Sequence, residues 1–358
     1  KFAALSKIIG NNIDMCYISF IVPVYNLKES EVRNCIHSIK QQTYEDYEVI
    51  IVDDGSTNGI EKVCDEIGER EGIKVIHQKN QGLAAARNTG MNASSGVWIV
   101  HVDGDDWVDS HLAEELKNKS IDSTADIIIW GFVLDSGSVQ QELLLKDKCA
   151  FDRPYSKIKE NVLCSILDYD NSFASLSINT SWGKAYRRDF IERKKLFYDL
   201  RLRRAQDVVY NLYAFTVASK IEYIDKALNI YRNDNVSLSR GYNPKTFEYL
   251  RATALAVNEY VNENDVSENV KIASVAFIQR CFRMINEQSF LHKNNKDSFA
   301  TRKRQFTEAI KSEPFLSAFA SGVVRNAMLD KITDILYKHK FFFGISCYNA
   351  CLGVALQF

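Results

Sequence analysis

The chain has 358 residues, of which 46% are hydrophobic and 25% are charged, and its formal net charge is −1. This composition is ordinary for a soluble globular protein with room for two domains. Because there is neither a basic excess nor an acidic tail, the charge predicts no nucleic-acid partner. The eight cysteines form no Cys-x-x-Cys pair, which argues against a cysteine-built zinc site and fits a reducing cytoplasm.

Residues 17 to 107 alternate between strand and helix patterns. Apolar runs predict strands at 18–22, 48–52, 73–77 and 97–102. Between them, apolar residues recur at helical spacing over 32–39, 60–67 and 82–91. Strands that alternate with helices at this spacing require right-handed crossovers and a mostly parallel sheet.

The pattern changes after Trp107. Apolar runs predict strands at 126–133, 179–186 and 221–224, helices at 156–167 and 205–218, and a loop with an edge hairpin over 136–155. From residue 244 onward the pattern is helical. We therefore expect one α/β half over 17–120, a second half of the same domain over 121–240, and a helical region over 241–358.

The strongest chemical signal is the run Asp103-Gly104-Asp105-Asp106-Trp107, directly after an apolar strand. Parallel α/β sheets bind ligands at the carboxyl ends of their strands. Carboxylates this close repel one another unless a cation or strong donors lie among them. Such clusters suit Mn²⁺ or Mg²⁺, which usually bridge to phosphates. The run therefore predicts a phosphorylated ligand bound with a divalent metal.

Two further polar clusters end predicted strands, Pro23-Val24-Tyr25-Asn26 and Asp53-Asp54-Gly55-Ser56. Taken alone, the second cluster is an ordinary turn. Two acidic clusters at the same edge of one sheet favour a shared site. Arg87 is unusual on its alanine-rich helix, and it is either an ion-pair partner for Asp53 or Asp54 or a group that faces the ligand.

These motifs occur in order with Gln42-Thr43-Tyr44, Asn80-Gln81-Gly82 and Ala86-Arg87-Asn88-Thr89-Gly90. In this the chain resembles the family 2 glycosyltransferases, and among them bacterial enzymes that build capsule, exopolysaccharide or lipid-linked glycans. The resemblance is strong over 17–107 and weaker to Arg232. It implies a GT-A fold, which is α/β and Rossmann-like with a mostly parallel central sheet flanked by helices, here followed by a C-terminal helical extension.

The resemblance also implies a UDP-sugar donor. In that assignment Pro23, Tyr25 and Asp54 border the uridine base and ribose, with Asp53 and Arg87 close by.

The acidic run receives the metal in the same assignment. Asp105 ligates the Mn²⁺ or Mg²⁺ that bridges the donor diphosphate, and Asp103 contacts the ribose or a metal-bound water. Asp106 faces the donor sugar. The metal supplies a Lewis acid for the departing diphosphate.

An inverting transfer needs a base that takes the proton of the acceptor hydroxyl. Family members carry a Glu-Asp pair at the start of a helix, and Gln206-Asp207 matches it here. Asp207 is therefore the expected base, held ionised by the helix dipole, although a first-turn helix acid is the plainer interpretation. Gln206 replaces the usual Glu, so a non-catalytic binder of sugar nucleotides stays an alternative.

Trp182 and Lys184 are the candidate acceptor-side residues. Indole faces stack on sugars, but buried tryptophans also form core. Arg201, Arg203 and Arg204 either neutralise a diphosphate on the donor or on a lipid-linked acceptor, or are solvated surface charge. His101 alternates with apolar residues and is expected in the core.

The segment 341–358 holds no charge and follows Lys338-His339-Lys340. It is too polar for a bilayer span. It fits an interfacial membrane helix or one packed against protein. The resemblance implies a glycan or lipid-linked acceptor. The expected location is cytoplasmic, at the inner face of the cell membrane if 338–358 binds it.

Other enzyme classes fit less well. Haloacid-dehalogenase-type phosphatases share an Asp-x-Asp after a strand, but they normally carry Thr or Val where this chain has Trp107. Nucleotidyltransferases usually have a Gly-rich basic loop after the first strand, which Tyr25-Asn26-Leu27-Lys28 is not. A dehydrogenase would require a Gly-x-Gly-x-x-Gly motif there.

Overall fold

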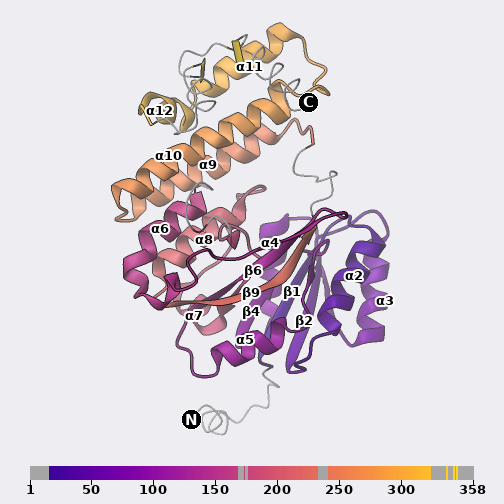
Figure 1. Cartoon of the computed structure of the whole chain (residues 1–358). Coiled ribbons are helices and arrows are strands. Elements are labelled where there is room, and N and C mark those ends of the chain that lie inside the picture. Colours follow the sequence, from indigo (N-terminus) through magenta and orange to yellow (C-terminus); the bar gives the residue numbers. More distant parts are fainter. Residues whose placement is uncertain are drawn as a thin grey trace.

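The structure is a computed structural model of the whole chain (Figure 1). It describes residues 16–167, 173, 176–232, 241–323, 336–337, 342 and 344–345.

The first half is built as the alternating pattern predicts. Its parallel strands are β1 (Ile18–Val24), β2 (Tyr47–Asp53), β3 (Lys74–His77) and β4 (Trp98–His101), in the order β3-β2-β1-β4. The crossovers carry α2 (Glu29–Lys40), α3 (Ile60–Glu71) and α4 (Leu83–Ala93). Because Val24 pairs with Asp53, the loops after β1 and β2 leave the sheet at the same edge.

The second half adds strands to the β4 side of the same sheet. Its elements are β5 (Trp107–Val108), α5 (Leu112–Ser120), β6 (Ile127–Asp135), β7 (Gln140–Leu143), a 3₁₀ turn at Ala150–Asp152, α6 (Tyr155–Leu167), β8 (Lys184–Arg187), α7 (Arg188–Lys194), α8 (Gln206–Val217) and β9 (Ile221–Arg232). The order continues β4-β8-β6-β9-β5, with β7 on β6 as the expected edge hairpin. β8 is antiparallel to β4 and β6, so the α/β sheet is mixed beyond its parallel half.

Two expected strands have different bounds. The strand expected over 179–186 is confined to Lys184–Arg187, and residues 179–183 form a turn in which Gly183 has φ +74°. The strand expected over 221–224 continues to Arg232 through a register shift opposite Gly131. Exposed Asp225 and Lys226 lie at that shift, and these two polar residues interrupt the apolar run that the sequence pattern follows.

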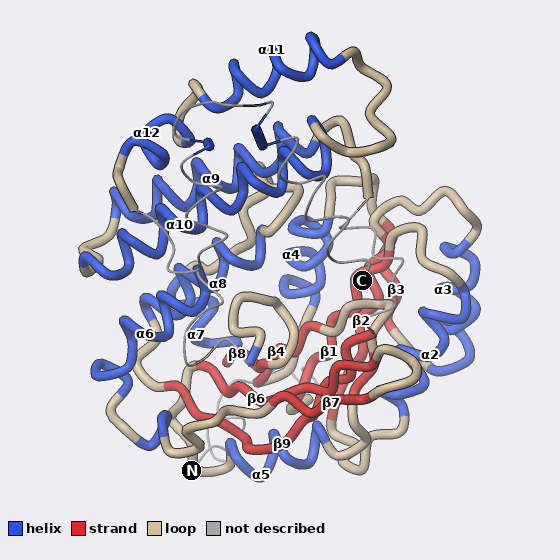
Figure 2. Tube along the Cα trace, turned by 45° about the horizontal axis from the view of Figure 1, so that its top comes forward, coloured by secondary structure: helices blue, strands red, loops and turns tan. Residues whose placement is uncertain are grey.

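The helices cover both faces of the sheet (Figure 2). One core cluster joins α2, α3 and α5 to one face, and another joins α4, α6, α7 and α8 to the other. The second cluster continues into the C-terminal helices, which are α9 (Thr246–Glu263), α10 (Glu268–Ile285), a π-helical turn (Asn286–Phe290), α11 (Phe299–Ile310) and α12 (Phe315–Ala320). The helical extension therefore shares its core with the helices that cover this face of the sheet.

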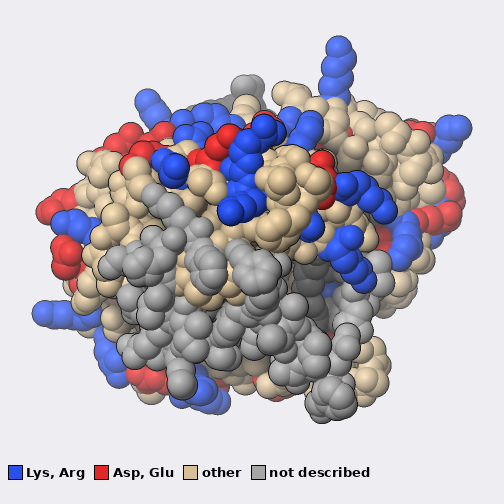
Figure 3. Space-filling view, turned by 90° about the horizontal axis from the view of Figure 1, so that it is seen from above, with Lys and Arg blue, Asp and Glu red and all other residues tan. Residues whose placement is uncertain are grey.

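Most of the segment 338–358, for which the sequence predicts a helix that lies on a membrane or packs against protein, falls outside the described residues. Within it, Phe342 and Ile345 are buried, and the Phe342 ring packs 5.1 Å from that of Phe306 on α11. In the described part of the chain, no helix is both long and apolar enough to cross a bilayer. Seen from above, the face formed by the helical extension mixes basic and acidic side chains (Figure 3).

Candidate functional site

The loops after β1 and β2 are tied together at the edge of the sheet. Asn26, in the left-handed region at φ 52°, donates its backbone N–H to Ser56 Oγ at 3.0 Å. Its side-chain Oδ1 accepts the backbone N–H of Thr57 at 2.7 Å. The neighbouring Tyr25 is 47% exposed, so a large aromatic side chain stands free beside a rigid loop. Pro23 precedes it as a buried residue of β1.

Asp53 supports the β2 loop from below. It is buried, accepts the Ser56 backbone N–H at 3.0 Å, and its Oδ2 lies 2.9 Å from His77 Nδ1. The other His77 nitrogen lies 2.9 Å from Asp65 on α3. Hydrogen bonds to Asp53 and Asp65 raise the pKa of His77. Asp53 thus joins β2 to β3 directly and to α3 through His77. Its contacts support the loop after β2, and its expected place close to the donor stays a prediction.

Asp54 organises the loop that leads into α4. Its Oδ1 accepts Gln78 Nε2 at 2.7 Å and the Gln81 N–H at 2.9 Å, and its Oδ2 accepts the Gly82 N–H at 2.7 Å. Three donors on one buried carboxylate form a strong charge-assisted set. The ion pair between Arg87 and Asp53 or Asp54, one of the two sequence-based interpretations, is not formed.

The three acids of the run have different environments. Asp105 is exposed, and desolvation with the charge of Asp103 raises its pKa. Asp106 is buried, accepts the Arg232 N–H at 3.1 Å, and its pKa is raised well above its usual range by burial and by its two neighbours. Asp106 thus anchors the end of β9, and its expected contact with the donor sugar stays a prediction.

Arg87 is the buried partner of the acidic run. Its Nη2 lies 2.7 Å from Asp103 Oδ1, and its guanidinium carbon lies 5.5 Å from the centre of the Tyr198 ring. Burial opposes the charged form, but Asp103, Tyr198 and Asp207 outweigh it and raise the pKa of Arg87. Its Nε and Nη1 are buried without a hydrogen-bond partner among the described residues.

Asp207 reaches the same place from the second half of the chain. It is partly buried in the first turn of α8, where its Oδ1 accepts the Val208 N–H at 3.0 Å. Burial raises its pKa, Arg87 lowers it, and Asp103 raises it further. Desolvation is the largest of these effects, and the expectation that Asp207 is held ionised as a base stays a prediction. Gln206 beside it is buried.

Lys184 holds the turn beneath the site. It is fully buried, and its Nζ donates to the carbonyls of Thr180 at 2.6 Å and Trp182 at 2.9 Å. Burial lowers its pKa to about 7, with Arg87 adding to and Asp207 opposing the shift. The placement of Lys184 as an acceptor contact is therefore corrected. Its ammonium satisfies carbonyls that a strand would have paired, which explains the missing residues of β8.

Trp182 lies in this turn. It is 5% exposed, and its ring packs 4.9 Å from Phe132 and stacks 5.5 Å from Tyr231. An aromatic wall therefore stands one residue before Arg232, whose backbone supports Asp106.

Two buried side chains complete the site from below. His101 lies in β4 as expected, and burial together with Arg87 and Lys184 keeps its pKa well below its usual range. Tyr198 stacks 4.0 Å from Tyr210 on α8 and donates to Ser181 Oγ at 2.9 Å. Sequence reasoning missed Tyr198 because it stands in a loop without periodicity, and its contacts link the ends of three separate segments.

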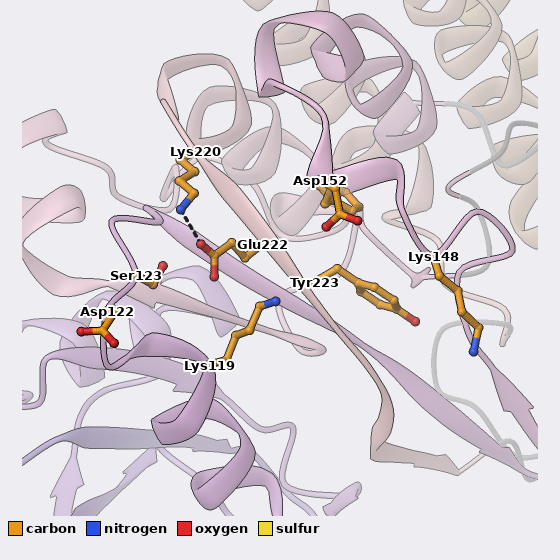
Figure 4. Close-up of a pocket in the computed structure, with 9 residues that line it drawn as sticks. Lys119, Asp122, Ser123, Lys148, Asp152, Lys220, Glu222 and Tyr223 are labelled. Atoms are coloured by element: carbon orange, nitrogen blue, oxygen red, sulfur yellow. Dashed lines mark ion pairs between the residues drawn. The ribbon is translucent and has the colours of Figure 1, made fainter.

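A polar cavity of about 440 Å³ lies away from this cluster (Figure 4). It is lined by Lys119, Lys148, Lys220, Asp122, Asp152 and Glu222, together with Phe151 and Tyr223. Two of its lysines are paired, Lys220 with Glu222 at 2.6 Å and Lys148 with Asp225 at 2.5 Å. It lies at the start of β9, whereas Asp106 binds the end, and it holds none of the predicted site residues.

In the described part of the chain, no three His, Cys, Asp or Glu residues are grouped to hold a metal by themselves. Asp103 and Asp105 provide two carboxylates. That is the usual protein contribution to Mg²⁺ sites in which substrate phosphates and water supply the other ligands. The donor set thus fits a metal that arrives with a phosphorylated ligand.

Comparison with known proteins gives a family and a fold. The family described as Glycosyl transferase family 2 matches residues 19–193. Putative glycosyltransferase EpsH of Bacillus subtilis (strain 168) is 30% identical over 73% of this chain and 74% of its own length. Glycosyltransferase GlyA of Streptococcus pneumoniae serotype 4 is 33% identical over 68% of this chain, which spans only 34% of GlyA.

Among solved structures, S. aureus TarS 1–349 in complex with UDP superposes with a TM-score of 0.62 at 16% identity, covering 95% of this chain and 92% of that one. At this identity the likeness shows the fold, an α/β sheet domain that continues into helices.

Proposed function

The chain belongs to glycosyl transferase family 2, and from that premise we propose that it is a metal-dependent, inverting enzyme. It transfers a sugar from a UDP-sugar to a hydroxyl of a glycan or lipid-linked acceptor in cell-surface polysaccharide synthesis.

One observation carries this proposal. Arg87 binds Asp103 at 2.7 Å, and the Tyr198 ring beside Arg87 stacks 4.0 Å from Tyr210 on α8, the helix whose first turn holds Asp207. The charges of Asp103 and Asp207 both raise the pKa of the buried Arg87. More than a hundred residues of chain separate the two acids, so the fold brings together a carboxylate suited to a base and the acidic run. A phosphatase would need no such second acid from a distant helix.

The donor end is supported by the exposed Tyr25 and by the rigid loops that Asp53 and Asp54 maintain. TarS, which shares the fold, has been solved with UDP and with UDP-GlcNAc. We assign the uridine to the side of Pro23 and Tyr25, and the diphosphate to the side of Asp103 and Asp105. Both assignments are those that the family resemblance implies, and the strand order supports them because β1, which carries Pro23, pairs directly with β4, which leads to Asp103.

Asp105 and Asp103 would hold Mn²⁺ or Mg²⁺, which when bound supplies positive charge that stabilises the departing diphosphate. Arg87 fixes the orientation of the Asp103 carboxylate through the 2.7 Å contact. Because Arg87 is buried, it cannot swing out to replace the metal at the diphosphate.

Asp207 accepts the proton of the acceptor hydroxyl. A raised pKa makes a carboxylate a stronger base, provided that it is still ionised at the working pH. Arg87 opposes the rise in the pKa of Asp207, and so favours the ionised form that a base requires. The buried Trp182 ring and the partly buried Tyr231 ring then form a boundary beside the end of β9.

The test is a thermal-shift titration with UDP, MnCl₂ and both together. We expect a higher melting temperature only with both, and Asp105→Ala should abolish this joint effect while melting normally without ligand. Asp122→Ala, an exposed acid outside the site, serves as the matched control. If no nucleoside diphosphate stabilises the wild-type protein in the presence of metal, the proposal fails.

A further inference from the structure

A second cavity, of about 430 Å³, borders the donor side of the site. It is lined by Asn80, Arg201, Arg203, Lys245, Glu248, Tyr249 and Ala252. Three of these seven side chains are cationic and one is acidic, so the cavity has an excess of positive charge.

Two of the cations are available to a ligand. Arg201 is occupied, because its guanidinium pairs with Asp199 and with Glu259 on α9 at 2.8 Å each. Arg203 and Lys245 are exposed, and neither forms an ion pair with any residue that the structure describes. Cations that outnumber the acids in a cavity and form no ion pair attract anions, and a guanidinium is well shaped for a phosphate.

The fold holds Arg203 in place. Gly82, at φ 91°, leaves room for it, since a Cβ there would come within 2.3 Å of the Arg203 guanidinium. On the other side, the neighbouring Arg204 carbonyl accepts the Thr253 hydroxyl of α9 at 2.5 Å. The loop is thus fastened at both sides, and Arg203 stays beside the cavity.

The cavity adjoins both ends of the proposed reaction. Asn80 lies two residues before Gly82, whose N–H binds Asp54 on the donor side. Arg203 lies four residues before Asp207, the proposed base. A ligand in the cavity would therefore contact the loop that leads into α8, the helix of the proposed base, and the lining includes no residue of the acidic run.

We infer that this cavity binds a phosphate carried by the acceptor. The inference rests on the proposed function and adds the chemical class of the acceptor to it. Arg203 and Lys245 contact the phosphate, and the Tyr249 ring with the Asn80 amide offers a stacking face and hydrogen bonds to an attached sugar. Glu248 lines the same cavity, and its carboxylate weakens the attraction of the cations for an anion.

The experiment measures phosphate binding by calorimetry with saturating UDP and Mn²⁺, so that the donor site is filled. The probes are glucose 1-phosphate, farnesyl diphosphate and a glycerol-phosphate oligomer, with glucose as the neutral control. We expect at least one phosphate probe to bind and glucose not to bind. Tighter binding of farnesyl diphosphate identifies a lipid-linked source, and tighter binding of the oligomer identifies a phosphodiester polymer.

Single-charge variants locate the binding. Arg203→Ala and Lys245→Ala should each weaken the phosphate probe by roughly tenfold, Arg203→Lys should weaken it less, and Glu248→Gln should strengthen it. Lys62→Ala, an exposed cation on α3, is the matched control and should change nothing.

Three results would overturn the inference: no phosphate probe binding to the wild type, equal binding by Arg203→Ala, or loss of UDP binding in the same variants. The last result would place the cations in the donor site. Failure of the proposed function is distinguishable, since it would appear as absent UDP binding in the wild type.

Discussion

At the scale of single residues, the site depends on a buried cation shared by two acids. Arg87 holds Asp103 directly, and its charge also reaches Asp207. Substitutions of Asp103, Asp207 and Arg87 should therefore have different effects. Loss of Asp103 should weaken donor binding, whereas loss of Asp207 should stop proton transfer.

Asp207→Asn should keep donor binding and lose transfer. An amide has nearly the same size as the carboxylate but cannot accept the proton, so we expect the transfer rate to fall by about 10²- to 10⁴-fold. The joint stabilisation by UDP and Mn²⁺ should be unchanged in the thermal-shift assay. Full transfer activity in this variant would refute Asp207 as the base.

Arg87→Met should shift the pH dependence of the reaction. The base works only when ionised, so the rate falls as the pH drops through the pKa of Asp207, which burial already raises. Without Arg87, which lowers that pKa, the acidic limb of kcat/KM should move up by about one pH unit or more. Arg87→Lys keeps the charge and is the control, and an acidic limb that stays in place would contradict the account.

At the scale of elements, the loop before α4 depends on Asp54. Asp54→Ala removes the acceptor of three N–H groups. These hydrogen bonds to a charged group are only part-buried, so we expect a loss of about 1–3 kcal/mol in the free energy of unfolding. Urea denaturation measures it, with Asp122→Ala as a control that should be near neutral. A similar small loss in both variants would show that the loop is held otherwise.

The parallel half of the fold was predictable because its signals are local. Short crossovers between apolar runs allow few topologies, and β1 to β4 follow them. The length of β9 could not be predicted in this way. The polar Asp225 and Lys226 lie at a register shift that only the partner strand β6 determines.

The candidate site was predictable in part. The residue types of the acidic run and of Asp207 predicted that they belong to one site. In the fold both lie near Arg87. Which of the acids are structural and which bind a ligand could not be predicted from the sequence. A carboxylate that holds a loop, such as Asp54, is the same residue type as one that binds a ligand. Lys184 shows the same difficulty, because only the fold reveals that it is buried under carbonyl groups.

At the scale of the whole molecule, the sheet and the C-terminal helices share one core. The cluster that contains Phe215 of α8 also contains Phe282 of α10, and Phe282 contacts the rings of Phe306, Phe315, Phe319 and Tyr337. The two regions should therefore unfold together, although the sequence pattern changes between them.

Phe282→Ala tests this coupling. It should cost about 3–5 kcal/mol, as is usual for a large buried ring. The four tryptophans all lie before residue 183, so fluorescence reports on the sheet and far-UV circular dichroism on the whole chain. We expect both urea midpoints to fall equally. An unchanged fluorescence midpoint with an early dichroism phase would instead define a separate helical domain.

The pairing of β9 limits which insertions and deletions the protein can tolerate. Its end pairs Ile230 with Trp107 and presents the Arg232 N–H to Asp106. Since one added or missing residue in a strand turns every following side chain to the other face, an insertion or deletion within 227–232 would misplace the acidic run. The loop over 144–154 has no such partner at the site, so natural variation in length should accumulate there.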